Sequence, residues 1–182
     1  MDTTDAPQII EHHSLPLTFT PYVTNWIPST AKFILGGQTP SAKGILKIVQ
    51  LKKAKLEELT QIDEGDGVKC ASFGCSELDG QLLAIGDFNG EIRLHDLEKG
   101  GVSWRVKNAH KKIVNSLDGI GGGGRGYGAP EILTGSRDGC VRLWDPRQQG
   151  PVSFIFEFFW FFLEFLFFEF CCFLGFLTTI CE

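Results

Sequence analysis

The chain has 182 residues, of which 43% are hydrophobic, and it carries 22 acidic and 17 basic residues. This length is enough for one domain with a buried core. Four acids lie after residue 152, and the other 18 nearly balance the 17 bases, so charge gives no case for a nucleic-acid partner. The six cysteines lack paired metal-ligand spacing and predict neither a zinc site nor a disulfide framework. The acidic N-terminus lacks the apolar segment of a secretory signal, so we expect a cytoplasmic protein.

The N-terminal part of the chain is predicted to form strands. Residues 1–6 are expected to be disordered, and residues 7–12, PQIIEH, are a candidate edge strand because proline stands at their start. Segment 52–59, KKAKLEEL, is ambiguous, since its flanks favour strand but its residues are good helix formers. Further strands are predicted at 22–28, 32–35 and 44–51.

The central part of the chain repeats one pattern. At a shift of 49 residues, AIGDFNGEIRLHD (84–96) aligns with LTGSRDGCVRLWD (133–145), and at a shift of 46, residues 44–48 align with 90–94. Three units of roughly 45 residues predict an all-β fold, a partial β-propeller of about three blades. The strands predicted within the middle unit are 68–73, 82–85, 91–97 and 102–106.

The third unit carries a hairpin signal. Two alternating apolar runs in 131–147 flank the polar turn Ser136–Gly139, and Asp-Gly between such runs is typical of a tight antiparallel hairpin. The second run ends on Trp144 and Asp145, and His110 stands 34 positions before Trp144. The Gly-rich stretch 119–128, which we expect to be a mobile surface loop, accounts for this long spacing.

A histidine upstream and Trp-Asp at the end of a third strand resemble a WD repeat. In such repeats a buried His, a Ser or Thr, an Asp and the Trp form a hydrogen-bonded tetrad. The second unit has Asn89 in the place of Asp138 and His95 in the place of Trp144. The resemblance therefore implies a full tetrad only in the third unit, with these members: His110, Thr134 or alternatively Ser136, Asp138 and Trp144.

A more specific resemblance covers residues 7 to about 152. The stretch DGIGGGGRGYGAPEILTGSRDG, followed by WDPRQ, together with PQIIEH and GDFNG, is similar to the WD-repeat dynein axonemal assembly factors. Members of this family form a closed propeller from a longer chain, so the resemblance implies a propeller fragment at 7–152. The blades that it implies are roughly 19–62, 67–107 and 110–152.

The resemblance stops at residue 152. Residues 153–182 form a low-complexity, Phe-rich tail that lacks the alternation and turn residues of a fourth blade. An aberrant read-through or mis-spliced end, a tail anchor and an authentic hydrophobic segment are the alternatives. Three glutamates interrupt the apolar run, and basic flanks are missing, which disfavours the membrane reading. We expect the chain as written to be an unstable, truncated form.

Several motifs that resemble binding or metal sites have simpler structural explanations. Gly121–Gly126 satisfies G-x-G-x-x-G, but a strand rather than a helix follows, so a surface loop is favoured over a phosphate cradle. His12 and His13 have no ligand at metal spacing, and His12 aligns with the structural histidine of the family's first blade. Lys111 and Lys112 beside His110 could form a basic patch. Catalytic motifs are missing from the sequence, and we predict a non-catalytic protein without cofactor or metal.

The family resemblance implies a scaffold or adaptor for protein complex assembly. Its expected role is that of a co-chaperone in the cytoplasmic preassembly of axonemal dynein arms. The implied partners are the Reptin and Pontin ATPases, prefoldin-like subunits and dynein arm subunits. The alternative is a substrate receptor of a cullin-RING ubiquitin ligase, because Trp144–Arg147 resembles the W-D-x-R motif that docks on the ligase adaptor. In that reading Asp145 and Arg147 would contact the adaptor.

Overall fold

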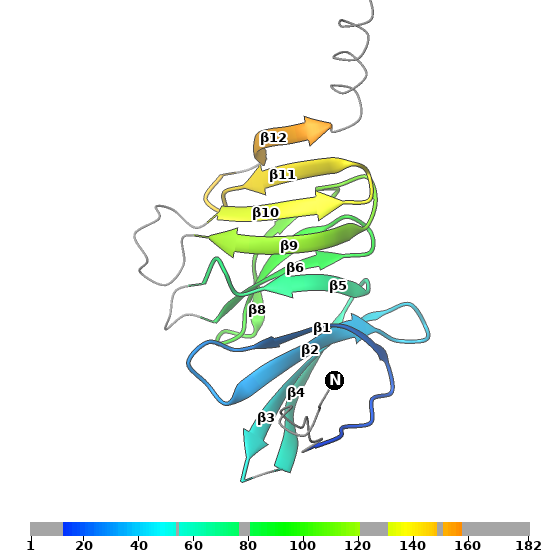
Figure 1. The fold of residues 1–182 in the computed structure, drawn as a ribbon, viewed down its shortest axis with the longest axis vertical. Coiled ribbons are helices and arrows are strands. Elements are labelled where there is room, and N and C mark those ends of the chain that lie inside the picture. The colour runs from blue at the N-terminus through cyan, green and yellow to red at the C-terminus, as the bar shows by residue number, and fades with distance from the viewer. Residues whose placement is uncertain (1–12, 54, 77–80, 121–130, 149–150, 158–182) are drawn as a thin grey trace, which may run out of the picture.

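The computed structural model describes residues 13–53, 55–76, 81–120, 131–148 and, as backbone only, 151–157. Every regular element among them is a strand, and the twelve strands form three four-stranded antiparallel sheets. Figure 1 shows the sheets stacked along the long axis of the molecule, each made of strands consecutive in the chain. The predicted all-β, propeller-like architecture is confirmed.

The first sheet, blade 1, disproves the helical alternative for residues 52–59. Residues 55–59 belong to a strand that pairs with the preceding one, so that Leu51 faces Leu56 across the hairpin. The pairing gives the backbone of this segment hydrogen-bond partners, and Leu56 packs against the apolar cluster around Val49. Tertiary contacts therefore override the helix propensity of KKAKLEEL. The strands of blade 1 are β1 Thr20–Trp26, β2 Lys32–Gln38, β3 Gly44–Lys52 and β4 Lys55–Glu64.

Blades 2 and 3 repeat this meander with the same central turn. In both blades the turn between the second and third strands ends on a glycine with positive φ, 83° at Gly90 and 84° at Gly139, a conformation that favours glycine. The strands of blade 2 are β5 Val68–Ser72, β6 Leu82–Asp87, β7 Ile92–Asp96 and β8 Gly101–Val106. Those of blade 3 are β9 Val114–Ile120, β10 Glu131–Ser136, β11 Cys140–Trp144 and β12 Pro151–Glu157.

Strand β12 crosses the expected boundary between residues 152 and 153. Its residues 151–157 pair antiparallel with β11 and complete the sheet of blade 3. Pairing of an outer strand uses backbone donors and acceptors, which a Phe-rich sequence supplies as well as an alternating one. The blade therefore extends five residues into the segment predicted to be the tail.

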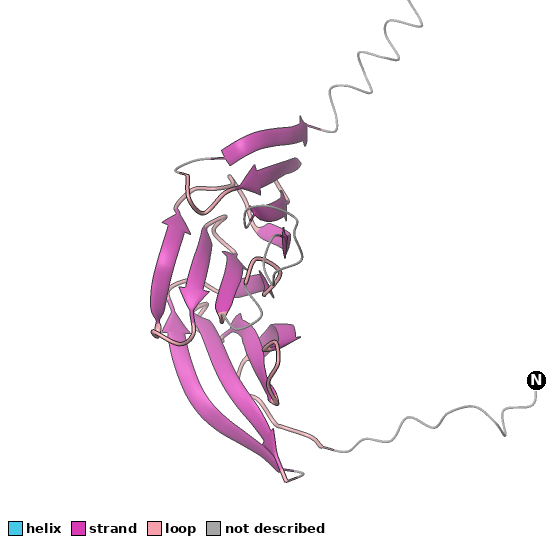
Figure 2. Ribbon diagram, turned by 90° about the vertical axis from the view of Figure 1, so that its left-hand side faces the viewer, coloured by secondary structure: helices cyan, strands magenta, loops and turns pink. Residues whose placement is uncertain are grey.

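The blades pack through their first strands and through apolar layers between them. Strand β5 contacts both β1 and β9, so the first strands of the three blades lie side by side. Figure 2 shows the three sheets following one another in a curved row. One buried cluster, with Ile34 and Leu83 at its centre, lies between blades 1 and 2. A second, with Ile92, Ile132 and Trp144, lies between blades 2 and 3. Each blade therefore depends on its neighbour for burial.

Some expectations lie outside the described residues. They are the disordered start (1–6), the edge strand 7–12 with His12, residues 121–128 of the predicted Gly-rich loop and the tail beyond 157. The loop prediction was wrong for its first two residues, because Gly119 and Ile120 belong to β9 and pair with Ile132 and Glu131. His13 is described and exposed.

Candidate functional site

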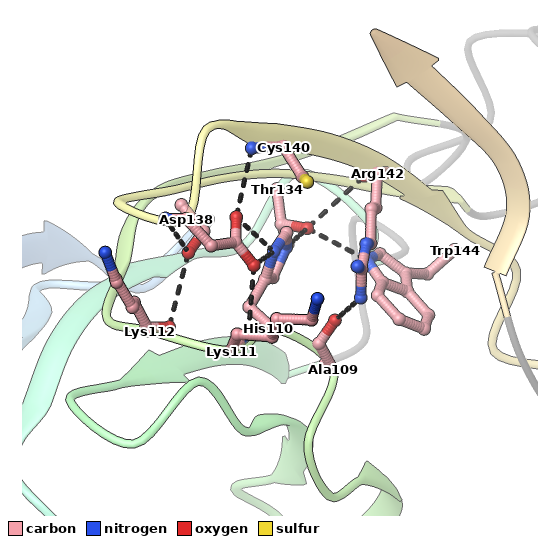
Figure 3. A network of polar contacts seen from close by, with 10 residues as sticks. Ala109, His110, Lys111, Lys112, Thr134, Asp138, Cys140, Arg142 and Trp144 are labelled. Carbon is pink, nitrogen blue, oxygen red and sulfur yellow. Dashed lines mark hydrogen bonds and ion pairs between the residues drawn. The ribbon is translucent and has the colours of Figure 1, made fainter. Parts of the chain in front are cut away.

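The polar core of blade 3 brings together the four residues of the expected tetrad (Figure 3). Trp144 Nε1 donates a hydrogen bond to Thr134 Oγ1 at 2.8 Å, and Thr134 Oγ1 lies 2.8 Å from His110 Nε2. His110 Nδ1 lies 3.1 Å from Asp138 Oδ2. A neutral His110 protonated on Nδ1 satisfies the whole chain, because Thr134 then donates to Nε2 while Nδ1 donates to Asp138. These four residues are called the tetrad below.

Asp138 is held in place by backbone amides as well as by His110. Its carboxylate accepts hydrogen bonds from the amides of Lys111 and Cys140 at 2.9 and 3.0 Å. Burial alone would raise the pKa of Asp138, but these amides and His110 lower it to about 2. The pKa of His110 lies below its ordinary value because burial disfavours the charged ring, although Asp138 opposes this. The pair is therefore a carboxylate and a neutral imidazole at pH 7.

Ser136, the alternative member, stands outside the tetrad. Its hydroxyl accepts from the amide of Asp138 and donates to the carbonyl of Lys112. It stabilises the β10–β11 turn, which positions the Asp138 carboxylate toward His110. The hydroxyl between the histidine and the tryptophan is that of Thr134.

Blade 2 has a different polar core at the same place. Pairing registers place Gly86 and Gly135 at equivalent positions, so that Glu64 corresponds to His110, Ile85 to Thr134 and His95 to Trp144. Asn89 corresponds to Asp138 but is exposed. The sequence pattern therefore predicted that His95 takes the place of the tetrad tryptophan. The structure shows that Glu64 and Ile85 take the places of the histidine and the threonine.

Four buried ionisable residues, Glu64, Asp87, Arg93 and His95, form what we call the charged cluster. His95 Nε2 lies 3.0 Å from Glu64 Oε1, and Arg93, which is 2% exposed, lies 3.4 Å from both Glu64 and Asp87. Burial would raise the pKa of Glu64, but His95 and Arg93 lower it below its ordinary value. Burial also raises the pKa of Asp87, and there it prevails over the backbone amide and Arg93.

Sequence reasoning missed the charged cluster. The available signal was a basic residue at one register position of all three blades, Lys47, Arg93 and Arg142. In blade 3, Arg142 donates to the carbonyl of Ala109. In blade 1, Lys47 pairs with Glu58 at 2.9 Å.

Blade 1 fills the position of the polar core with apolar side chains. Leu35 and Val49, which correspond to Thr134 and Trp144, are buried in one cluster against which Leu17 packs. The three blades thus place an apolar, a charged and a hydrogen-bonded core at one structural position.

The two residues of the predicted adaptor contact pair with each other. Arg147 Nη2 lies 2.6 Å from Asp145 Oδ2, and Arg147 Nε lies 2.9 Å from Asp145 Oδ1. The hydrogen bonds from Arg147 lower the pKa of Asp145 to about 2. Asp145 is buried, whereas the side chain of Arg147 is 63% exposed. Docking of a ligase adaptor here stays a prediction.

The described residues contain no group of three or more His, Cys, Asp or Glu side chains that could hold a metal ion. Burial raises the pKa of the Cys70 thiol to about 12 and that of Cys75 to about 11, so both stay protonated at neutral pH. A search of the described residues finds no helix of the length and apolarity needed to cross a membrane.

Four-stranded meander sheets packed through their first strands, with the tetrad in blade 3, define a WD-repeat β-propeller protein. The structure of Sqt1 from Chaetomium thermophilum, bound to the N-terminus of the ribosomal protein L10, has the same fold. It matches 70% of this chain and 32% of that chain with a TM-score of 0.54 and 24% identity. No family model matches the chain.

The curated relatives are more specific. Dynein axonemal assembly factor 10 of Chlamydomonas reinhardtii is 44% identical over 154 residues, and that of Homo sapiens is 39% identical over 154 residues. Each match covers 84% of this chain and 43% of the relative. The chain is thus a homologue of the dynein axonemal assembly factor 10 proteins, as the sequence resemblance predicted, and it spans less than half of their length.

Proposed function

We propose that this chain provides propeller blades of a non-catalytic scaffold for the assembly of axonemal dyneins. The observation that carries this proposal is the 44% identity to the Chlamydomonas reinhardtii assembly factor along 84% of the chain. In this role the chain acts in the cytoplasm as a co-chaperone. Its partners are dynein arm subunits and a complex of the Reptin and Pontin ATPases with prefoldin-like subunits.

The structure supports a scaffold for a physical reason. The inter-blade layers and the polar cores of blades 2 and 3 fix the strands, so the connecting loops are presented by a framework that is already ordered. Binding to loops on such a framework costs little conformational entropy. Burial raises the pKa values of the Cys70 and Cys75 thiols, so both stay protonated at neutral pH, which fits a binding protein better than an enzyme that uses either as a nucleophile.

A chimera in Chlamydomonas reinhardtii tests the proposal. In a strain without its own assembly factor 10, the 154-residue matched segment of that protein would be replaced by the matched segment of this chain. We expect dynein arm content, measured on immunoblots of isolated axonemes, to be restored, and Reptin and Pontin to co-purify with the chimera. A matched chimera carrying Arg93→Met should fail. A stable chimera that leaves axonemes without dynein arms would refute the proposal.

A further inference from the structure

A hollow of about 370 Å³ opens at the junction of blades 2 and 3, lined by Phe88, Lys112, Ile113 and Arg137. Phe88 lies in the β6–β7 turn, Arg137 in the β10–β11 turn, and the other two just before β9. The hollow therefore depends on both blades. Its volume falls in the range of small binding pockets and can receive a large side chain.

The backbone around the hollow is fixed. The amide of Arg137 donates to the carbonyl of Ile113 at 3.0 Å, and the amide of Phe88 donates to the carbonyl of Gly67 at 3.1 Å. The hydroxyl of Ser136 donates to the carbonyl of Lys112. The lining residues are thus positioned before any ligand arrives, which lowers the entropy cost of binding.

The charge around the hollow is opposite to that of the chain. The formal net charge of the chain is −5, yet the described residues that line the hollow include two cations and no acid. The acids next to them in sequence face inward, since Asp87 lies close to Arg93 and Asp138 belongs to the tetrad. The side chains of Lys112 and Arg137 are exposed. An anionic group would be attracted to this site.

An aromatic surface continues from the hollow toward blade 1. The Tyr22 ring, 42% exposed, lies edge-on to Phe88 with the ring centroids 5.1 Å apart. Lys69 Nζ lies 4.8 Å from the centroid of the Tyr22 ring. Basic side chains and two aromatic rings, Tyr22 exposed and Phe88 half-buried, therefore come from all three blades, which suits an extended chain rather than a single ion.

We propose that this hollow binds a linear acidic segment of a partner protein. One large apolar side chain of the segment enters between Phe88 and Ile113, and its carboxylates pair with Lys112 and Arg137. Phosphate compounds fit less well, because the lining holds only two cations and half of it is apolar. This inference deepens the proposed scaffold function and rests on it by naming the chemistry of a partner.

Fluorescence anisotropy with labelled peptides tests the inference on the 182-residue chain. The probe is acetyl-EDEFLDED, and its comparison peptide is acetyl-EDEGSDED, which keeps the charge and lacks the apolar residues. We expect the first to bind more tightly than the second and its binding to weaken as salt rises. Lys112→Glu combined with Arg137→Glu should weaken binding roughly tenfold or more, because two charge-assisted contacts are lost.

The matched control is Lys52→Glu combined with Lys55→Glu, at the β3–β4 hairpin, where both side chains are also exposed. This control should bind the probe like the parent chain. The inference is overturned if the parent chain ignores the probe, if both double variants weaken binding equally, or if inorganic phosphate displaces the probe. None of these outcomes bears on the chimera, whose failure would instead refute the scaffold function itself.

Discussion

Blades 2 and 3 have different polar cores at the same structural position. In each, a polar residue from the segment that precedes the first strand must be linked to the end of the third strand. Blade 3 uses a neutral chain of hydrogen bonds from Trp144 through Thr134 to His110, with one carboxylate at its end. Blade 2 uses a pairing of Glu64 with His95 and Arg93.

The difference indicates that this position does not require particular residues. A hydrogen-bonded chain occupies it in blade 3, and ion pairs occupy it in blade 2, where the buried Arg93 Nε and His95 Nδ1 have no hydrogen-bond partner among the described residues. The apolar core of blade 1 at Leu35 and Val49 supports the same conclusion. The cores should differ, however, in what they cost when broken. A buried charge that loses its partner is destabilising by more than a neutral group that loses one hydrogen bond. The charged cluster should therefore be the most sensitive of the three.

Arg93→Met is expected to have the largest effect. It leaves Glu64 and Asp87 buried without their common cation, and breaking such a buried pair costs about 3–5 kcal/mol. The free energy of unfolding from urea titrations measures the change. The control is Lys99→Met, because Lys99 pairs with Asp96 on the same blade but its side chain is 86% exposed. Equal losses in the two variants would show that the charged cluster is not what stabilises blade 2.

Asp138→Ala is expected to have the next largest effect on stability. It removes the acceptor of His110 and of the amides of Lys111 and Cys140, and loss of a buried partner costs about 1–3 kcal/mol. Asn89→Ala, at the equivalent but exposed position of blade 2, should change stability by less than about 0.5 kcal/mol. Limited proteolysis and thermal melting of the two variants compare the blades. A larger effect at Asn89 would contradict the assignment of the tetrad.

Acidification should loosen blade 3 before blade 2. The pKa of folded His110 lies below 6.5, so the unfolded chain binds more protons and stability falls as the pH drops below about 6.5. Asp138 adds a second loss as the pH falls from about 4 to about 2. In blade 2 the contributions oppose each other, because the pKa of Glu64 is lowered and that of Asp87 is raised.

Amide hydrogen exchange between pH 7.5 and 5.0, corrected for intrinsic rates, should show this order. Strands β10 and β11 should lose protection relative to β6 and β7, and His110→Gln should remove the difference. Equal loss of protection in both blades would mean that His110 is not the group that titrates.

Lys47→Met should have the smallest effect. Lys47 occupies the register position of Arg93, but its partner Glu58 is 44% exposed and can be hydrated when the cation is lost. A change within about 1 kcal/mol is expected, as for other partly exposed pairs. Parallel urea titrations of Lys47→Met and Arg93→Met measure the two changes in the free energy of unfolding. A loss as large as that of Arg93→Met would show that register position, rather than burial of the carboxylates, sets the cost.

Much of the fold could be predicted because the signals are local. Apolar runs bounded by glycine turns located the strands, and the shifts of 46 and 49 residues revealed the repeat. The β3–β4 hairpin was ambiguous because the helix propensity of KKAKLEEL opposes its pairing with β3. Strand β12 was missed because outer-strand pairing depends on a backbone edge that the residues of β12 themselves do not reveal.

The candidate site, like the fold, could be predicted only in part from the sequence. One motif predicted His110, Asp138 and Trp144 but left the hydroxyl member open between Thr134 and Ser136. The structure places Thr134 between the histidine and the tryptophan. No local sequence motif reveals the charged cluster. Arg93 lies 29 residues from Glu64 in the sequence, and only the packing of blade 2 against blade 1 brings the two side chains together. A charged residue in an otherwise apolar strand signals a buried partner but does not name it.

Gly90 couples the stability of blade 2 to that of blade 3. The carbonyl of Gly90 accepts a hydrogen bond from the amide of His110 at 2.9 Å, and a Cβ atom at this glycine would collide with the His110 carbonyl oxygen. A side chain added to a turn of one blade would thus push on the histidine of the next. Variation at Gly90 should depend on the residue at 110, so the two blades would unfold and diverge in evolution as one unit.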